Sequence, residues 1–403
     1  MKKRIHIALV TAWYPPTKSI AVNRMHAFAK YLSQSEDIRV SVFTIGDIPY
    51  RQENEFIKVY AIPPSQVGEF LKNRSSDTKI IHIIRTLFNI LYSKVSGSPF
   101  QFWRKKIINQ LTEIHSHDPF SIILSSYSPE DAHLVVLDFL KKGNAIPWIA
   151  DMRDEMSLNP GLSNAKRESL RLVEYEIDKY AIAITSVSLP IVNDFKRLCS
   201  NVSNFEEVRN GFDHELTFNK HRNNVFTLGY FGTFYGNIKP THFFIALNEL
   251  KFKYPYFNFK VELYGVHNNY TTPSTLIENI EVFPALPYTE AICRMAEMDA
   301  LILLLPKQDR KGVYSGKIFD YLSVNKPIIA TVDVDDVAAE LLNSLQNNYV
   351  CQFDDVNAIQ DLIWNCYQEW INIESNLERL NDIQSFHRKF QVNKLEVLIK
   401  RLL

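Results

Sequence analysis

The sequence predicts an α/β protein with two doubly wound domains, each built on a parallel sheet. Short apolar runs alternate with segments of helical period along the whole chain, which is typical of parallel strands covered by helices on both faces. Two such series follow one another, and 403 residues with 46% hydrophobic side chains are enough for two ordinary cores. We expect a first domain over 1–212 plus a returning segment at about 385–403, and a second over 213–384.

Each element of the two series has its own pattern. IHIALVTA, at the start of the first series, leads into Pro15-Pro16 without a small-residue cleavage site, so we interpret it as a buried strand and not a signal peptide. The predicted strands are 5–12, 38–45, 57–62, 120–125, 146–150 and 181–186, then 225–231, 257–265, 280–283, 299–305, 327–332 and 349–353. The predicted helices include 21–34, 129–142, 163–180, 240–253, 288–297, 316–323 and 335–345. Ligands of such domains bind beyond the carboxyl ends of the strands, so we expect a site in the cleft between the domains.

Composition excludes several classes of protein. Lys and Arg number 45 against 45 Asp and Glu, a balance that argues against a dedicated nucleic-acid binder. The four cysteines are isolated in sequence, which removes CxxC zinc and redox sites and favours a reducing cytosol. No apolar stretch approaches the ~18 residues of a transmembrane helix. We therefore expect a cytoplasmic protein with no metal and no bound cofactor.

The segment GYFGTFYGNIK at 229–239 is the first candidate binding motif. A predicted strand runs into Gly232 and Thr233, and a helix starts near Pro240. Glycine lets a backbone approach a phosphate closely, a helix N-terminus offers free N–H groups, and Lys239 could add a full charge. An ordinary strand–turn–helix connection is the alternative interpretation.

The segment GVYSGKIFDY at 312–321 is the second candidate. Ser315 and Gly316 resemble a helix start, and Lys317 and Asp320 share one face of the first turn. A cation is unfavourable at a helix N-terminus, so Lys317 calls for an anionic partner such as a diphosphate. Asp320 could accept hydrogen bonds from a ribose diol. The alternative is a local surface pair between these two side chains.

The segment WIADMRDE at 148–155 places Asp151, Arg153 and Asp154 directly after a buried strand. Charges at such a position are expensive unless they are paired or used. Carboxylates there can bind sugar hydroxyls or accept a proton. The alternative is an internal lock between Arg153 and Asp154 that shapes the loop.

Two further segments bear on binding. DVDD at 333–336 has the spacing of a metal-binding DxD triplet, but its acids also suit a helix N-cap, which is the interpretation we favour. Residues 72–106 combine eight Lys or Arg with one acid and interleaved aromatic residues. That composition fits an anionic membrane surface. The alternatives are a solvated helix pair over the core of the first domain and, least favoured because the rest of the chain is neutral, a nucleic-acid contact.

Together, the motifs resemble the GT-B fold glycosyltransferases of the group 1 type, glycosyltransferase family four, in a subgroup with a DxRD variant. The resemblance covers nearly the whole chain. It is carried, in order, by WYPP with the helix IAVNRMHAFAKYLS, then ADMRDE, VRNGFD, LGYFGTFYGNIKP, SGKIFDYLSVNKPIIAT and SFHRKFQVNKLEVLIKRLL. It implies two Rossmann-like domains that face each other across a cleft, with a C-terminal helix that returns to the first.

The resemblance also implies roles for individual residues. A nucleotide-sugar donor would be bound by the second domain, with its diphosphate on Gly232, Thr233, Lys239, Ser315, Gly316 and Lys317, its ribose on Asp320, and its base on the loop at Ala285 and Leu286. Asp151, Arg153 and Asp154 would lie at the reacting sugar, and Lys18, Ser19, Asn23 and Arg24 on the acceptor side. The family retains anomeric configuration without a metal, and the donor phosphate helps to deprotonate the acceptor.

We therefore expect a glycosyltransferase that moves a sugar to a glycan or lipid-linked acceptor of the cell surface, docked at the inner face of the cell membrane. The sequence departs from the family's pattern in three places. Gly312 stands where members often carry Glu, and Lys18-Ser19 stands where they often have a glycine pair. An Arg that is common early in the diphosphate loop is also missing. A nucleotide-sugar epimerase of the same fold and a non-catalytic nucleotide-sugar-binding partner protein remain the alternatives.

Overall fold

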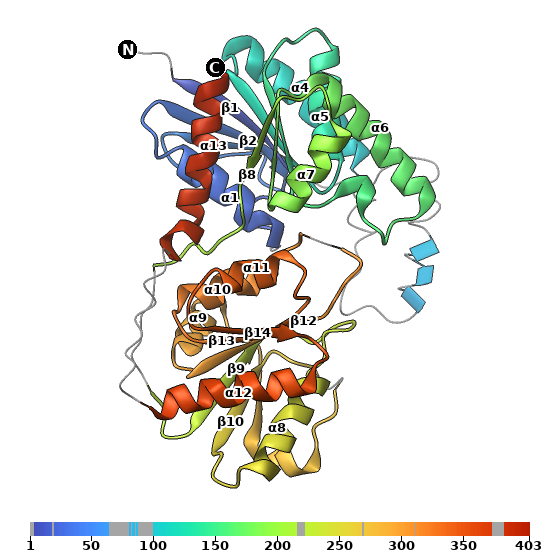
Figure 1. Ribbon diagram of the computed structural model, residues 1–403. Coiled ribbons are helices and arrows are strands. Elements are labelled where there is room, and N and C mark those ends of the chain that lie inside the picture. Colours follow the sequence, from blue (N-terminus) through green and yellow to red (C-terminus); the bar gives the residue numbers. More distant parts are fainter. Residues whose placement is uncertain are drawn as a thin grey trace. The chain divides into compact units, whose positions relative to one another are not determined.

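The chain forms two compact units in the computed structural model, which describes residues 4–17, 20–63, 80–81, 83–84, 86–87, 100–215, 222–267, 270–310, 312–372 and 383–403. Unit 1 comprises Met1–Arg209 and Arg388–Leu403, and unit 2 comprises Asn210–His387. Each unit is a parallel sheet between helices, and the C-terminal helix belongs to unit 1 (Figure 1). The predicted fold class is therefore confirmed.

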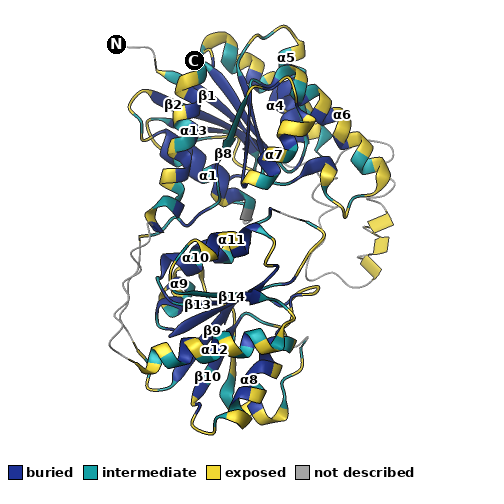
Figure 2. Ribbon diagram, in the orientation of Figure 1, coloured by how far each residue is buried: buried dark blue, intermediate teal, exposed yellow. Residues whose placement is uncertain are grey.

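Unit 1 is built on an eight-stranded sheet of order β3-β4-β2-β1-β5-β6-β7-β8, in which only β3 is antiparallel to its neighbour. Its strands are β1 (Ile5–Val10), β2 (Ile38–Ile45), β3 (Tyr50–Gln52), β4 (Ile57–Ile62), β5 (Ile122–Tyr127), β6 (Trp148–Met152), β7 (Ala183–Ser186) and β8 (Asn204–Glu207). The central strands are buried along their whole length because helices cover both faces (Figure 2).

The helices of unit 1 form two layers. They are α1 (Ile20–Leu32), α4 (Gln101–His117), α5 (Asp131–Lys141), α6 (Asn164–Tyr180), α7 (Leu189–Leu198) and α13 (Arg388–Leu402), with a short 3-10 turn η1 (Met156–Leu158). Figure 1 shows α1 and α13 on one side of the sheet and α4, α5 and α6 on the other. Met25 and Phe28 of α1 and Leu395 of α13 share one apolar core with the strands, so the last helix completes the first unit.

Unit 2 is built on a six-stranded parallel sheet of order β11-β10-β9-β12-β13-β14. Its strands are β9 (Phe226–Phe231), β10 (Phe259–Tyr264), β11 (Ile280–Phe283), β12 (Ala300–Leu305), β13 (Ile328–Val332) and β14 (Asn348–Gln352). Its helices are α8 (Thr241–Lys253), α9 (Tyr288–Ala296), α10 (Gly316–Ser323), α11 (Val337–Asn343) and α12 (Val356–Ile371), with 3-10 turns η2 (Ser274–Asn279) and η3 (Ile383–Phe386). Helices α8 and α12 pack on one face, and α9, α10 and α11 on the other (Figure 1).

Two strands were not predicted from the sequence. β3 consists of polar residues with an exposed pattern, and β8 reads NFEE and is half-buried throughout. Both lie at the edges of the sheet of unit 1. Edge strands have one free side and need no continuous apolar run, so the pattern used to detect buried strands does not find them.

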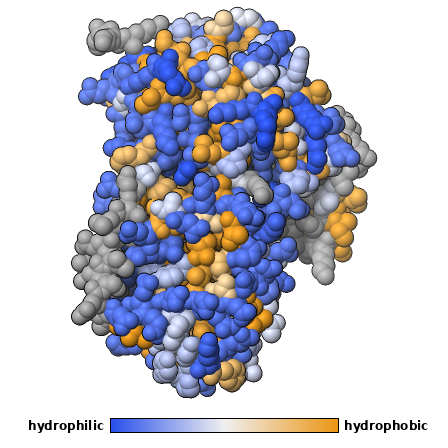
Figure 3. Space-filling view, viewed as in Figure 1, coloured by the Kyte–Doolittle hydropathy of each residue, from blue (hydrophilic) through white to orange (hydrophobic). Residues whose placement is uncertain are grey.

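The predicted membrane segment at 72–106 lies largely outside the described residues. Within the described part, Ile80, Ile83, Ile84 and Leu87 are each more than half exposed. Figure 1 draws this short segment in light blue, and Figure 3 shows orange, hydrophobic atoms on the same side of the view. The C-terminal end of this segment belongs to α4, in which Trp103 is buried against unit 1 and not exposed on the surface. None of the helices in the described ranges is both long and apolar enough to cross a membrane.

Candidate functional site

The carboxyl end of β9 forms the turn that the glycine motif predicted. Gly232 has φ +121°, a backbone conformation that favours glycine, and its N–H donates to the carbonyl of Tyr264 at 2.8 Å. The hydroxyl of Thr233 donates to the carbonyl of Gly265 at 3.2 Å. These bonds fix the turn after β9 to the turn after β10, at one edge of the sheet.

Lys317 lies directly against this turn. A Cβ at Gly232 would stand 2.6 Å from Lys317 Cε and 2.7 Å from Nζ, so the Lys317 side chain occupies the space that any side chain at residue 232 would need. Nζ donates to the hydroxyl of Tyr230 at 2.9 Å and lies 4.2 Å from the centre of that ring. No carboxylate pairs with it among the described residues. Burial lowers its pKa from 10.5 to about 8.

The N-terminus of α10 is open around Lys317. Ser315 caps the helix with an extended backbone, but its side chain makes no capping hydrogen bond. A Cβ at Gly316 would meet nothing within 4 Å. The first N–H groups of a helix lack partners inside the helix and carry a partial positive charge. The turn after β9, the Lys317 ammonium and these N–H groups therefore form one site suited to an anion.

Asp320, one turn further along α10, has a different partner from Lys317. It accepts a hydrogen bond from the Tyr288 hydroxyl at 2.7 Å, so the surface pair considered from the sequence is not what the structure contains. Tyr321, the next residue, is buried, and its hydroxyl oxygen accepts a hydrogen bond from the backbone N–H of Phe231 at 3.0 Å. α10 is thereby anchored to the end of β9, with Lys317 on the glycine turn.

The loop at Ala285 and Leu286 borders the same edge. Gly265 ends β10 with φ +75°, and the Cβ of Ala285 lies 3.3 Å from where a Cβ of Gly265 would be. Leu286 packs against the core under α9 and α10. Gly232, Thr233, Ala285, Ser315, Gly316 and Lys317 are thus brought to one edge of unit 2. Lys239 is exposed and precedes α8, and its predicted role stays a prediction.

Asp151 is fully buried at the end of β6 and forms an ion pair with Arg24 of α1. Its oxygens accept from Arg24 Nη2 at 2.6 Å and Nε at 3.1 Å, and from the hydroxyls of Ser126 and Thr185, each at 2.8 Å. Burial opposes ionisation of Asp151, but Arg24 and the two hydroxyls more than offset it and lower its pKa. Arg24 also donates to the carbonyl of Val208 at 2.7 Å. Asp151 and Arg24 are both buried and compensate each other's charge within unit 1.

Asp154 acts on Arg153 electrostatically, but the hydrogen bonds of the Arg153 side chain go to the backbone. Arg153 Nε and Nη2 donate to the carbonyl oxygens of Tyr127 and Ser128, and burial lowers its pKa. Arg153 therefore fixes the loop that follows β5. Asp154 is half-buried.

The residues predicted on the acceptor side lie in different environments. Asn23 is exposed on α1, whereas Arg24 belongs to the ion pair with Asp151. Lys18 and Ser19 lie outside the described residues. The catalytic roles of Asp151, Arg153 and Asp154 stay predictions, and so does the acceptor role of this segment.

The acids at 333–336 act as a helix cap, as favoured from the sequence. Asp336 caps α11, accepting from the N–H of Val337 at 2.8 Å and from that of Gly312 at 2.7 Å. Among the described residues no group of three or more His, Cys, Asp or Glu could hold a metal ion. Gly312 has φ +83°, a backbone conformation that favours glycine.

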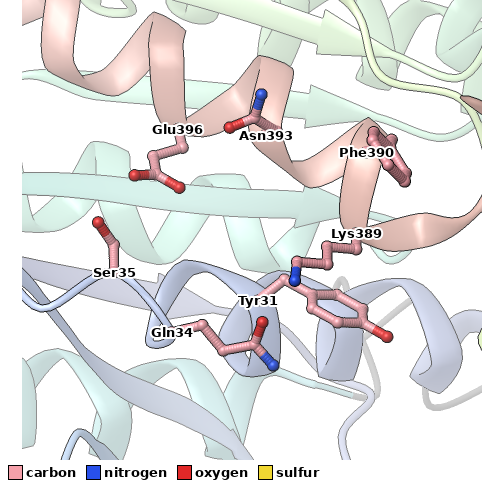
Figure 4. A pocket seen from close by; sticks show the side chains of 7 residues that line it. All are labelled: Tyr31, Gln34, Ser35, Lys389, Phe390, Asn393 and Glu396. Atoms are coloured by element: carbon pink, nitrogen blue, oxygen red, sulfur yellow. The ribbon is translucent and has the colours of Figure 1, made fainter.

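A cavity of about 350 Å³ lies in unit 1, between the end of α1 and α13. Figure 4 shows its lining side chains, which are Tyr31, Gln34, Ser35, Lys389, Phe390, Asn393 and Glu396. None of the site residues predicted from the sequence lines it. It is therefore separate from the group around Lys317.

Sequence reasoning missed the aromatic and histidine partners of the site: Tyr230, Tyr288, Tyr321 and His214. Tyr230 was visible only as one of several aromatic residues in a strand, and Tyr288 as the first residue of a predicted helix. Their contacts with Lys317 and Asp320 join residues 87 and 32 positions apart. No local pattern signals such pairs.

Comparison with known proteins places the fold. No protein-family model matches the chain, and no curated protein matches its sequence. Among solved structures it is similar to the trehalose-6-phosphate synthase OtsA (TM-score 0.69, 9% identity, 99% of each chain). It is also similar to the lipopolysaccharide outer core galactosyltransferase WaaB (0.59, 10%, 99% of this chain and 100% of that one) and to Anabaena HepE in complex with UDP-glucose (0.60, 14%, 99% and 100%). These neighbours have the GT-B fold, and the chain shares it over its whole length.

Proposed function

We propose that the chain is a glycosyltransferase that takes its sugar from a nucleotide-diphosphate donor bound to unit 2. The observation that carries the proposal is Lys317, a partly buried ammonium that lies against the Gly232 turn without a carboxylate partner among the described residues. Burying a cation without a counter-ion costs free energy. A bound diphosphate would supply that counter-ion.

The same residues suit the chemistry of glycosyl transfer. When the bond between sugar and diphosphate breaks, negative charge develops on the leaving phosphate. A fixed ammonium and the N–H groups at the start of α10 stabilise that charge without having to reorganise. Lys239 would add a second cation, and Asp320 would bind the ribose.

Some parts of the proposal rest on resemblance. The structural neighbours include a galactosyltransferase of the lipopolysaccharide core and a protein in complex with UDP-glucose. We propose a glycan or lipid-linked acceptor of the cell surface, retention of anomeric configuration without a metal, and a cytoplasmic location at the inner face of the membrane. The basic and aromatic residues of 72–106, with the exposed isoleucines at 80, 83 and 84, would contact anionic lipid.

A ligand screen tests the donor site first. UDP, GDP, ADP, CDP and dTDP and their sugars are added to the full chain, and the melting temperature is measured, since a ligand that binds only the folded state raises it. We expect one diphosphate to stabilise the wild type and the Lys317→Ala variant to lose most of that shift. Lys253→Ala, which removes an exposed cation of α8, is the matched control and should behave as the wild type.

Product analysis then separates the activities. With the selected donor and a panel of acceptors, we expect transfer of the sugar, and a 10²–10³-fold fall in kcat/KM for Lys317→Ala. Conversion of the donor without an acceptor would instead identify an epimerase. Tight nucleotide binding with neither transfer nor conversion would identify a binding partner protein, and equal turnover by Lys317→Ala and wild type would refute the role of Lys317.

A further inference from the structure

A closed ring of polar contacts surrounds Asp320 in unit 2. The Tyr288 hydroxyl donates to Asp320 Oδ1 at 2.7 Å and lies 3.4 Å from His214 Nδ1. His214 Nε2 lies 2.7 Å from the Ser323 hydroxyl, which donates to the backbone carbonyl of Asp320 at 2.6 Å. The ring therefore starts and ends at the same residue and joins three separate segments of the chain.

The protonation of His214 follows from these bonds. The proton of the Ser323 hydroxyl is directed to the carbonyl of Asp320, so this hydroxyl can only accept from His214, and Nε2 carries a hydrogen. The Tyr288 proton is directed to the Asp320 carboxylate. With its hydrogen on Nε2, the imidazole has none on Nδ1 to donate, so His214 contacts Tyr288 through its ring, with the ring centres 6.0 Å apart.

The position of this ring of bonds suggests more than a role in stability. Tyr288 is 52% exposed, and a hydrogen bond made at the surface adds little to the free energy of folding. Yet Tyr288 follows the loop at Ala285 and Leu286 directly, and Asp320 lies one turn after Lys317. The ring thus joins the loop expected to hold the base to the acid expected to hold the ribose.

We propose that Tyr288 is a positioning residue for the nucleoside of the donor, with His214 holding it in place. This inference rests on the proposed function. A half-buried carboxylate without a fixed partner samples several rotamers, and fixing it before binding reduces the entropy lost when the ribose arrives. Tyr288 keeps the Asp320 carboxylate in one orientation, in which it accepts hydrogen bonds from the ribose diol.

The inference predicts discrimination between ribose and deoxyribose. A site built to accept hydrogen bonds from hydroxyl groups rejects an analogue that lacks one, because its polar groups are then left without a partner. Without Tyr288 the carboxylate is less ordered, so affinity for the ribonucleotide falls more than affinity for the deoxyribonucleotide.

Calorimetric titration of the full chain tests this inference. The probes are the ribonucleoside diphosphate that stabilises the chain most and its 2′-deoxy form. We expect Tyr288→Phe to weaken binding of the ribonucleotide about 3- to 10-fold and to reduce the preference over the deoxy form. Tyr256→Phe is the matched control, an exposed tyrosine of unit 2 at the start of the loop before β10, and it should bind as the wild type.

A double-mutant cycle gives the readout that a purely structural residue would not change. If Tyr288 acts through the acid, Tyr288→Phe should have no further effect on affinity in an Asp320→Ala background. Independent, additive effects would overturn the inference, as would unchanged affinities in Tyr288→Phe. If the wild type binds no nucleoside diphosphate, the donor site fails as well. If binding is normal and Lys317-dependent but insensitive to Tyr288, only this inference fails.

Discussion

At the scale of the residue, Lys317 and Gly312 define what the candidate donor site can do. Lys317 is a cation whose described partners are a phenol and its ring, not a carboxylate. Gly312 has a left-handed backbone, and its N–H is held by the cap of α11. The first residue favours an anionic ligand, and the second has a backbone conformation that favours glycine over any residue with a side chain.

Donor affinity should depend on pH through Lys317. Burial lowers its pKa to about 8, so the ammonium is charged at pH 7 and becomes neutral as pH rises past 8. A diphosphate binds the charged form, and its own terminal phosphate has already ionised near pH 6. We expect calorimetric affinity to fall between pH 7 and pH 9.5 in the wild type. Lys317→Ala should bind weakly with no such slope, and an identical slope in both proteins would contradict the assignment.

Adding a side chain at residue 312 should lower the free energy of unfolding. Gly312→Glu and Gly312→Ala both place a Cβ on a backbone with φ +83°, which costs about 1–2 kcal/mol. The measurement is the free energy of unfolding in urea. Gly316→Ala is the control, because its Cβ meets open space and it should leave stability nearly unchanged. Equal stability of the wild type and Gly312→Ala would refute the backbone argument.

At the scale of the element, the Arg24–Asp151 pair holds four elements of unit 1 together. It joins α1 to β6, and Asp151 also accepts from Ser126 of β5 and Thr185 of β7. A single buried carboxylate with four hydrogen bonds orders the carboxyl ends of three neighbouring strands. The sequence identified the charges at this strand end, and the contacts indicate that pairing satisfies them.

Breaking this pair should be costly for stability. Arg24→Met leaves Asp151 buried without its counter-ion, which we expect to cost about 3–5 kcal/mol. Arg24→Met combined with Asp151→Leu removes both charges and should recover part of that loss. Urea unfolding monitored by tryptophan fluorescence measures both variants. A loss below about 1 kcal/mol in Arg24→Met would show that the pair is not a structural one.

At the scale of the whole molecule, the chain is two units connected by two crossings, at Arg209–Asn210 and at His387–Arg388. α13 contributes Val392, Leu395 and Leu398 to the core of unit 1, although they lie after the whole of unit 2 in the sequence. The first unit therefore cannot complete its core until the end of the chain has been made. Unit 2 has its own two apolar clusters.

A substitution that creates a cavity under α13 should destabilise unit 1 and leave unit 2 folded. Leu395→Ala removes a fully buried side chain and should cost about 2–5 kcal/mol. We expect amide hydrogen exchange to rise in unit 1 and to stay unchanged in β9, β12 and β13 of unit 2. Stabilisation by the nucleoside diphosphate should persist. Equal loss of protection in both units would show that they unfold as one.

Much of the fold could be predicted because its signals are local. Buried parallel strands such as Ala300–Leu305 are continuous apolar runs, and helices such as Asn164–Tyr180 have the helical period. The edge strands Tyr50–Gln52 and Asn204–Glu207 have neither signal. On the donor side, the glycine turn and the start of α10 were visible because helix starts and turns also have local residue preferences.

By itself, the sequence determined the alternation of elements, the two series and the order of the glycine and lysine motifs. Only the tertiary structure decided which partner each charge has. Lys317 meets Tyr230 across 87 residues, and Asp151 meets Arg24 across 127. The physical reason is that the spacing of apolar residues along the chain indicates which residues of an element face the core, but not which side chains they meet there. The environment of a buried charge is set by side chains that only folding brings together.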